Sequence, residues 1–379
     1  MENIQQHEAL NIFIKHFSII RDPRIDRKKL HNLVEIIIIA VIAVISGCEN
    51  FSEIQEFAKE RISWFKKFLI LKSGIPSHDT FSRVFALLDG REFEKCFIEW
   101  MQEITNISKG EIIAIDGKTA RRSFDTRGNK GPIHLVNAWA CKNAVVLGQF
   151  KTEEKSNEIT AIPKLLELLS IKNCIVTIDA MGTQKAIAKS IIEKEADYVL
   201  ALKENQKQLH QDVEYSFETA IEKKFVGFDF DSYEESEKSH GRIETRKYCT
   251  LRNLDWLLEK EKWANLNSIC MVTSTREVKG KISKETRYYI SSLSGNAKKI
   301  GHAIRSHWSV ENKLHWSLDV SFREDECRIR KQQGAENFAM LRKVALNFIK
   351  KEKTCKRGVQ IKRHKAGWSE RYLEKVLTA

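Results

Sequence analysis

The sequence lacks both the cysteine spacing of a structural zinc site and a hydrophobic run long enough for a membrane span. Its eight cysteines are scattered, and no CxxC or CxxH pair occurs. This argues against structural zinc and fits free thiols in a reducing cytosol. The longest apolar run, at 36–45, has ten residues, whereas a spanning helix needs about 20. With no secretory signal at its polar start, the chain is expected to be cytoplasmic, with no membrane role.

Proline is also scarce, with four in 379 residues, so long disordered linkers are not expected. Basic residues exceed acidic ones, 64 against 51, which gives a formal net charge of +13. The excess is spread along the chain. A polyanionic partner, most commonly nucleic acid, is the simplest interpretation, although charge alone also fits a basic soluble protein with no such role. The 42% hydrophobic content is enough for a substantial core.

Hydrophobic periodicity predicts a helical N-terminal domain over residues 1–108, followed by an α/β core. From 109 to 202 the predicted order is strand, strand, strand, helix, strand, helix, strand, which is typical of a mixed α/β layer fold with right-handed crossovers. A β-rich insertion is expected at 203–293 and a helical part of the core at 294–352. A basic C-terminal tail is expected at 353–379.

Two aspartates share one sequence context. Asp116 and Asp179 each follow a short apolar strand and precede a small residue. This position puts a carboxylate at the carboxyl end of a sheet, where open α/β sheets bind ligands. Carboxylates on neighbouring strands can bridge Mg²⁺, and two such ions can clamp an in-line phosphoryl displacement. Either aspartate alone is more simply a turn cap after a strand, but the pair favours a site.

A third acid lies in a predicted helix. His307, Glu311 and His315 are spaced four residues apart, so on an α-helix they share one face. A helical carboxylate that faces the strand ends could complete a metal site. Taken alone, Glu311 is more simply interpreted as a solvated glutamate on an amphipathic helix.

Three blocks of this sequence resemble bacterial insertion-sequence transposases. The first is AIDGK at 114–118, and the second is IDAMGTQ at 178–184. The third is HWSVEN at 307–312, followed by LHW at 314–316, LDV at 318–320 and ED at 324–325. Together they are similar to the H-repeat-associated (ISAs-type) transposases of the DDE superfamily, over residues from about 20 to 350.

The resemblance implies an RNase H-like catalytic core in which Asp116, Asp179 and Glu311 are the catalytic acids and metal ligands. It implies two Mg²⁺ ions, with Mn²⁺ as a substitute. The implied activity is cleavage of insertion-sequence ends and joining of the 3′-hydroxyl to target DNA by a homodimer. The long gap between Asp179 and Glu311 leaves room for the β insertion. The broader superfamily has Tyr, Arg and Lys where this chain has Ile304, His307 and Leu318, so those roles are not carried over.

Six basic residues are candidates for DNA contact. Three follow the first aspartate, where they could position a DNA backbone, although a solvated basic turn would look the same. Two in the insertion alternate onto one strand face, where they could hold phosphates or belong to a polar hairpin. The sixth opens the third block. The candidates are Lys118, Arg121, Arg122, Arg242, Arg246 and His307.

Two alternative functions remain open at this point. One is an RNase H-like nuclease without strand transfer, and the other is a domesticated DNA-binding protein without catalysis. Asp319 and Asp325 are the acids to test if Glu311 is dispensable.

Overall fold

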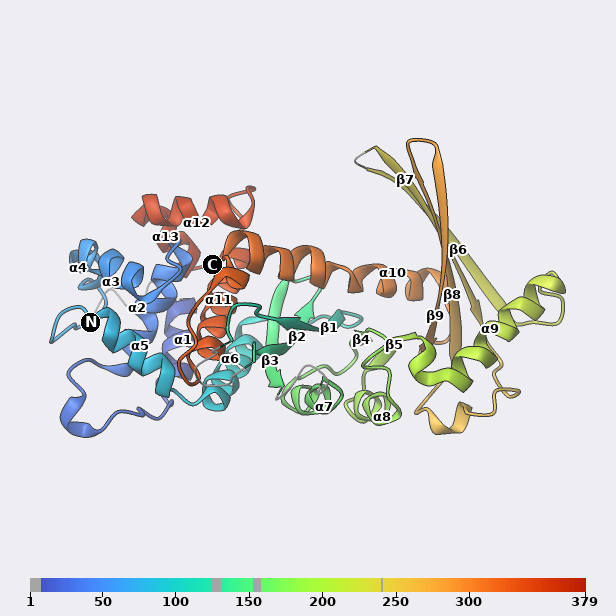
Figure 1. The fold of residues 1–379 in the computed structure, drawn as a ribbon, viewed down its shortest axis with the longest axis horizontal. Coiled ribbons are helices and arrows are strands. Elements are labelled where there is room, and N and C mark those ends of the chain that lie inside the picture. The colour runs from blue at the N-terminus through green and yellow to red at the C-terminus, as the bar shows by residue number, and fades with distance from the viewer. Residues whose placement is uncertain (1–7, 125–130, 153–157, 240) are drawn as a thin grey trace.

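The computed structural model describes residues 8–124, 131–152, 158–239 and 241–379. Helices from the two ends of the chain gather at one end of the molecule, and a long β-hairpin region extends from the other end (Figure 1). Within the described ranges, no helix is both long enough and apolar enough to cross a membrane.

The N-terminal helices pack around one apolar helix. Asn32 caps α2 by accepting from the backbone N–H groups of Val34 and Glu35, and eleven of the thirteen residues of α2 are buried. The run at 36–45 is therefore buried at the centre of the helical core. The helices are α1 (Glu8–Phe17), α2 (Leu33–Ile45), α3 (Phe51–Glu60), α4 (Ile62–Phe65), α5 (His78–Leu87) and α6 (Gly90–Ile104).

Within the described residues, nine strands form one sheet, in the order β3-β2-β1-β4-β5-β9-β8-β7-β6. β1 pairs antiparallel with β2 and parallel with β4, and β4 pairs parallel with β5. The strands are β1 (Ile112–Thr119), β2 (His134–Ala140), β3 (Val145–Thr152), β4 (Ile175–Ile178), β5 (Asp197–Leu202), β6 (Phe230–Ser239), β7 (Arg242–Leu251), β8 (Ser268–Val278) and β9 (Lys281–Ser291).

The strands of the predicted insertion extend the core sheet, because β9 pairs antiparallel with β5. The chain leaves β5 through α9 (Lys207–Glu222) and enters the insertion strands at β6. Helices α7 (Glu158–Leu168) and α8 (Lys185–Glu193) contact the core strands, and α10 (Ala297–His307) packs across β1, β4 and β5 and onto β6, β7 and β8. The helices thus cover both sides of the sheet, with α10 opposite α7 and α8 (Figure 1).

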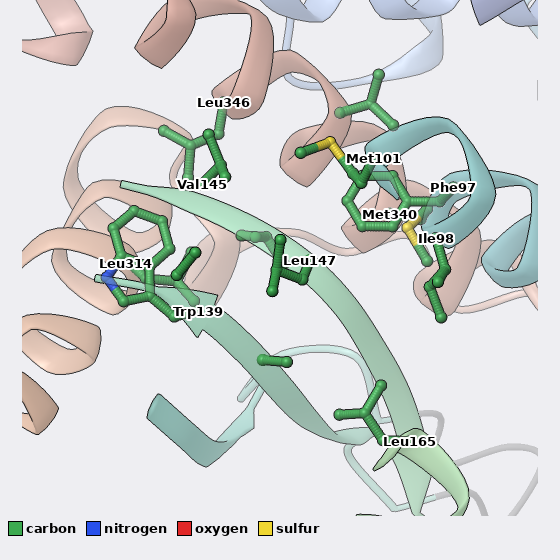
Figure 2. Close-up of a cluster of buried hydrophobic side chains, with 14 of the residues drawn as sticks. Phe97, Ile98, Met101, Trp139, Val145, Leu147, Leu165, Leu314, Met340 and Leu346 are labelled. Atoms are coloured by element: carbon green, nitrogen blue, oxygen red, sulfur yellow. The ribbon is translucent and has the colours of Figure 1, made fainter. Parts of the chain in front are cut away.

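The core between the sheet and the helices joins both halves of the chain. Figure 2 shows Val145 of β3 beside Leu346 of α11 (Gly334–Lys351), and Met101 of α6 beside Met340 of α11. Asn347 of α11 ties this layer to β3 by donating to the carbonyl of Val146 at 2.8 Å and accepting from its N–H at 2.9 Å.

The C-terminal segment differs from the expected basic tail. Residues 353–379 fold into α12 (Val359–Trp368) and α13 (Glu370–Leu377), which pack on α11 and, through α12, on α2. Arg363 of α12 is 3% exposed and pairs with Glu49 at 2.6 Å. Lys362 is also buried and pairs with Glu352 at 3.2 Å. Part of this positive charge is therefore structural and unavailable to a partner.

Candidate active site

The register of two parallel strands brings the two aspartates together. β1 and β4 pair with Ile115 opposite Ile178, so Asp116 and Asp179 are the next residues on neighbouring strands. β4 ends at Ile178, as expected, but β1 continues past Asp116 to Thr119 because it still pairs with β2. Backbone N–H groups fix both carboxylates: Gly117 donates to Asp116 Oδ1 at 2.9 Å, and Gly182 donates to Asp179 Oδ1 at 3.2 Å.

Glu311, although distant in sequence, lies at the same cavity as the two aspartates. Asp116, Asp179 and Glu311 all line one cavity of about 360 Å³, with Lys203 and His307 also in its wall. Asp116 and Asp179 come from the sheet, whereas Glu311 follows α10. The three acids that were singled out in the sequence are therefore gathered around one concave space.

The helix that carries Glu311 is wider than the sequence predicts. α10 ends at His307, and Val310–His315 and Ser317–Ser321 form π-helical turns. The buried Val310 and Leu314 anchor the inner side, and Trp139 of β2 donates from its indole nitrogen to Ser309 Oγ at 3.1 Å. Figure 2 shows Leu314 beside Trp139. Such wide turns are frequent at functional sites, and this one leaves Glu311 exposed while Val310 and Leu314 are buried.

The site concentrates negative charge. Burial, and then the negative charge of Asp179, raise the pKa of Asp116 from 3.8 to about 7. Burial is also the main cause that raises the pKa of Asp179. Two neighbouring carboxylates repel each other when both are ionised, and a bound cation would reduce this repulsion.

Two histidines beside the acids are neutral. His315 Nδ1 lies 3.6 Å from Asp116 Oδ2, and burial lowers the pKa of His315 to about 3. Its Nε2 atom is buried without a hydrogen-bond partner among the described residues. Burial also lowers the pKa of His307 to about 4, and its Nδ1 atom is hydrogen-bonded to Thr177 Oγ1 at 3.0 Å. At neutral pH a contact of His307 with DNA would therefore be a hydrogen bond without a charge.

Comparison with known protein families matches residues 107–348 to the family described as transposase DDE domain, and residues 14–101 to the DDE_Tnp_1-associated family. The chain belongs to the transposase DDE family. It is 45% identical over 375 residues to a protein of Escherichia coli O157:H7 named "Putative transposase YncI", covering 98% of this chain and 95% of that protein. It is 41% identical to "H repeat-associated putative transposase YhhI" of Escherichia coli K12, covering 97% and 98%.

Among solved structures, a piggyBac transposase synaptic complex with hairpin DNA aligns with a TM-score of 0.44 at 11% identity, covering 100% of this chain and 80% of that one. The resemblance to H-repeat-associated transposases that the three sequence blocks indicated is confirmed by the curated relatives.

The basic candidates of this transposase-family chain fall into two groups. Lys118 is two residues after Asp116, but its ammonium nitrogen is held 2.7 Å from Asp319 and 3.5 Å from Asp325. Arg121 also pairs with Asp325, at 3.2 Å, and its side chain is 81% exposed. Arg122 is exposed. Lys118 is thus committed to internal ion pairs, whereas the two arginines are accessible.

Arg242 and Arg246 both lie on β7 and line a second cavity, next to the acidic one. Arg242 is partly exposed and lies 3.8 Å from Glu244. Arg246 is 8% exposed and pairs with Glu244 at 2.6 Å. The expectation that the two arginines share a strand face is met, but the sequence did not indicate that carboxylates neutralise them.

A buried pair close to the aspartates was not predicted from the sequence. Glu158 at the start of α7 is hydrogen-bonded to His134 of β2 at 2.5 Å, and His134 is hydrogen-bonded to Thr119 of β1 at 2.7 Å. Glu158 is close enough to raise the pKa values of both aspartates. The only sequence signal was Gly117, where an added Cβ would lie 2.3 Å from Glu158 Oε1.

The acids suit a divalent cation in type but do not form a closed ligand set. Carboxylate oxygens are the ligands that Mg²⁺ prefers, and the pKa of Asp116 is raised by burial and then by the charge of Asp179, so a cation at this position would stabilise its ionised form. However, the described residues contain no group of three or more His, Cys, Asp or Glu side chains arranged to hold a metal ion. Cation binding would therefore need an adjustment of side chains around the cavity.

Proposed function

We propose that this chain is a DDE transposase with an RNase H-like core, which cleaves the ends of its insertion sequence and joins the 3′-hydroxyl to target DNA by two-metal phosphoryl transfer, acting as a homodimer. The observation that carries the proposal is the convergence of Asp116, Asp179 and Glu311 on one cavity from three distant parts of the chain. The strand order β3-β2-β1-β4-β5 supports an RNase H-like core, with antiparallel pairs on one side of β1 and parallel pairs on the other.

The proposed cofactor is a pair of Mg²⁺ ions, with Mn²⁺ as a substitute, and Asp116, Asp179 and Glu311 are the residues that would hold them. When bound, such ions stabilise the attacking and leaving oxygens of an in-line displacement. The protein supplies the fixed carboxylates: Gly117 and Gly182 orient two of them through backbone N–H groups. Glu311 is the exposed member and is free to adjust.

The proposed reaction has two steps. Water attacks the phosphodiester at the end of the element, which breaks the P–O bond to the 3′ oxygen and frees a 3′-hydroxyl. This hydroxyl then attacks a phosphodiester of the target DNA, and the displaced target oxygen leaves as a new 3′-hydroxyl. No covalent protein–DNA link forms, so the role of the protein is to position charge and DNA.

A strand-transfer assay tests this function. Labelled DNA from the end of the element is incubated with the protein, Mg²⁺ and a target plasmid, and the products are separated by size. We expect cleaved ends and end–plasmid joined products from the wild type, and neither product from Asp116→Asn. Cleavage by Asp116→Asn at the wild-type rate would refute the assignment.

The same assay separates the two alternatives. An RNase H-like nuclease would release cleaved ends without joined products. A non-catalytic DNA-binding protein would shift the DNA without cleaving it under any metal condition. Asp325→Asn is the matched control for the third acid, because Asp325 is committed to Lys118 and Arg121. It should keep activity that Glu311→Gln loses.

A further inference from the structure

A basic groove lies beside the acidic cavity. It has a volume of about 530 Å³ and is bordered by β7, β8, β9 and α10. Five of its residues also line the acidic cavity, Arg287 and Trp308 among them, so the two spaces adjoin. The cationic side chains that line the groove are Arg242, Arg246, Arg276, Lys284, Arg287 and Arg305.

One carboxylate bridges two of these arginines. Arg305 of α10 donates from Nη2 to both oxygens of Glu237 of β6, at 2.9 and 3.1 Å. Arg246 of β7 donates from Nη1 to the same carboxylate at 3.3 Å. Two guanidinium groups, from a helix and from a strand, thus converge on a single anion.

The strand register alone would disfavour this arrangement. Glu237 pairs directly with Glu244 across β6 and β7, and like charges opposite each other destabilise a sheet. Arg246 compensates by contacting both carboxylates, Glu244 at 2.6 Å and Glu237 at 3.3 Å. Glu244 therefore holds Arg246 in place even when Glu237 is removed.

We propose that the position of the Glu237 carboxylate, between Arg246 and Arg305, is a binding site for a backbone phosphate of DNA, and that DNA displaces the carboxylate when it binds. The inference rests on the proposed function and deepens it, because it assigns Arg305 to DNA contact and gives Glu237 the role of an internal competitor. Guanidinium groups bind carboxylate and phosphate oxygens with the same paired geometry.

The exposure of the three side chains supports displacement of the carboxylate rather than of the arginines. The side chain of Glu237 is 45% exposed, whereas those of Arg305 and Arg246 are 36% and 10% exposed. Glu237 also lies near the end of β6, so its side chain can turn into solvent without breaking the core. The arginines would remain and face the incoming anion.

The groove leads from this site to the acids. Arg287 of β9 stacks over the ring of Trp308, with its guanidinium carbon 5.0 Å from the ring centroid, and both residues border both spaces. A strand whose phosphate lies between Arg246 and Arg305 can therefore pass Arg287 and enter the acidic cavity. The groove would hold the DNA next to the bond that is cut.

Fluorescence anisotropy in EDTA tests the site without cleavage. The probe is fluorescein-labelled duplex DNA with the sequence that flanks the coding region. We expect Glu237→Gln to bind about three- to tenfold more tightly than the wild type, the size expected when two partly exposed ion pairs no longer oppose binding. Arg305→Gln should bind more weakly, with a salt dependence reduced by about one phosphate contact.

A matched control separates the site from net charge. Glu103 also contacts two basic side chains, Lys15 at 2.8 Å and His16 at 2.7 Å, but it lies on α6, outside the groove. Glu103→Gln changes the net charge by the same amount and should leave affinity nearly unchanged. In the double variant Glu237→Gln/Arg305→Gln, the gain from the first substitution should be largely lost.

The inference is overturned if Glu237→Gln binds no more tightly than the wild type, if Glu103→Gln gives an equal gain, or if the double variant keeps the full gain. These outcomes are distinct from failure of the proposed function. If the wild type binds this DNA and joins it to a target but Glu237→Gln behaves as the wild type, only the phosphate site is wrong. If the wild type neither binds nor cleaves the DNA, the proposed function itself is wrong.

Discussion

Asp116→Asn is expected to stabilise the folded protein in EDTA at alkaline pH while it abolishes DNA cleavage. The pKa of Asp116 is about 7 in the folded protein, because of burial and the neighbouring Asp179, against an ordinary value of 3.8. The folded state therefore binds more protons than the unfolded state, and stability falls as the pH rises between these two values. Asparagine removes the charge, and its Oδ1 can still accept from Gly117 N–H.

The magnitude follows from the difference in pKa. From 3.8 to about 7, at 1.36 kcal/mol per pKa unit, it amounts to at most roughly 4 kcal/mol. The gain of Asp116→Asn should be near zero below pH 4, grow between pH 4 and pH 7, and be complete above pH 7. Urea unfolding in EDTA at pH 5 and pH 8 measures it as a difference in free energy of unfolding, with the larger gain at pH 8.

A divalent cation should act on the same charge. Mg²⁺ should stabilise the wild type against urea at pH 8 by mass action and should stabilise Asp116→Asn much less. Glu94→Gln is the matched control, since burial and then Glu336 raise the pKa of Glu94 to about 9, outside the site. It should also gain stability in EDTA but keep the response to Mg²⁺ and the cleavage activity. The reasoning is refuted if Asp116→Asn is no more stable than the wild type at pH 8 in EDTA.

Three further substitutions test other parts of the structure. Gly117→Ala should lower the free energy of unfolding by about 1–3 kcal/mol, because the added Cβ would lie 2.3 Å from the buried Glu158 carboxylate. An unchanged urea midpoint would contradict this contact. Glu311→Gln should change the free energy of unfolding by less than about 0.5 kcal/mol, because the residue is exposed, yet eliminate cleavage in the strand-transfer assay. Arg363→Met should lower the free energy of unfolding by about 3–5 kcal/mol, because it leaves the partly buried Glu49 carboxylate without its positively charged partner. Limited proteolysis should then cut within the C-terminal helices, and a resistant C-terminus would argue against their packing.

The core strands were predictable because their hydrophobic pattern and their position agree. The order of strands and helices expected over 109–202 is the order observed from β1 to β5, and the apolar run before Asp179 ends where β4 ends, at Ile178. The proximity of Asp116 and Asp179 then follows from parallel pairing alone. Local sequence is sufficient here because a buried parallel strand is apolar on both faces.

The strands of the insertion were only partly predictable. β6, with the sequence FDSYEESEKS, is polar and largely exposed, so it has no hydrophobic signal and was missed. It forms because β7 provides backbone partners along its whole length. In the C-terminal segment, Lys362 and Arg363 resemble part of a charge run, whereas carbonyl groups and the carboxylates of Glu352 and Glu49 make their burial tolerable. Such compensation comes from residues distant in sequence, so no local pattern reveals it.

The third acid shows where periodicity misleads. An α-helix would put His307, Glu311 and His315 on one face, but the π-helical turn at Val310–His315 separates their surroundings. His307 and Glu311 line the acidic cavity, whereas His315 lies against Asp116. The wide turn is favoured by the tertiary contacts of its buried side, which the spacing of polar residues does not encode. The buried side of the turn is fixed, whereas Glu311 is exposed. To complete a set of ligands around a cation, the Glu311 side chain would therefore move, while the two aspartates on the strands stay in place.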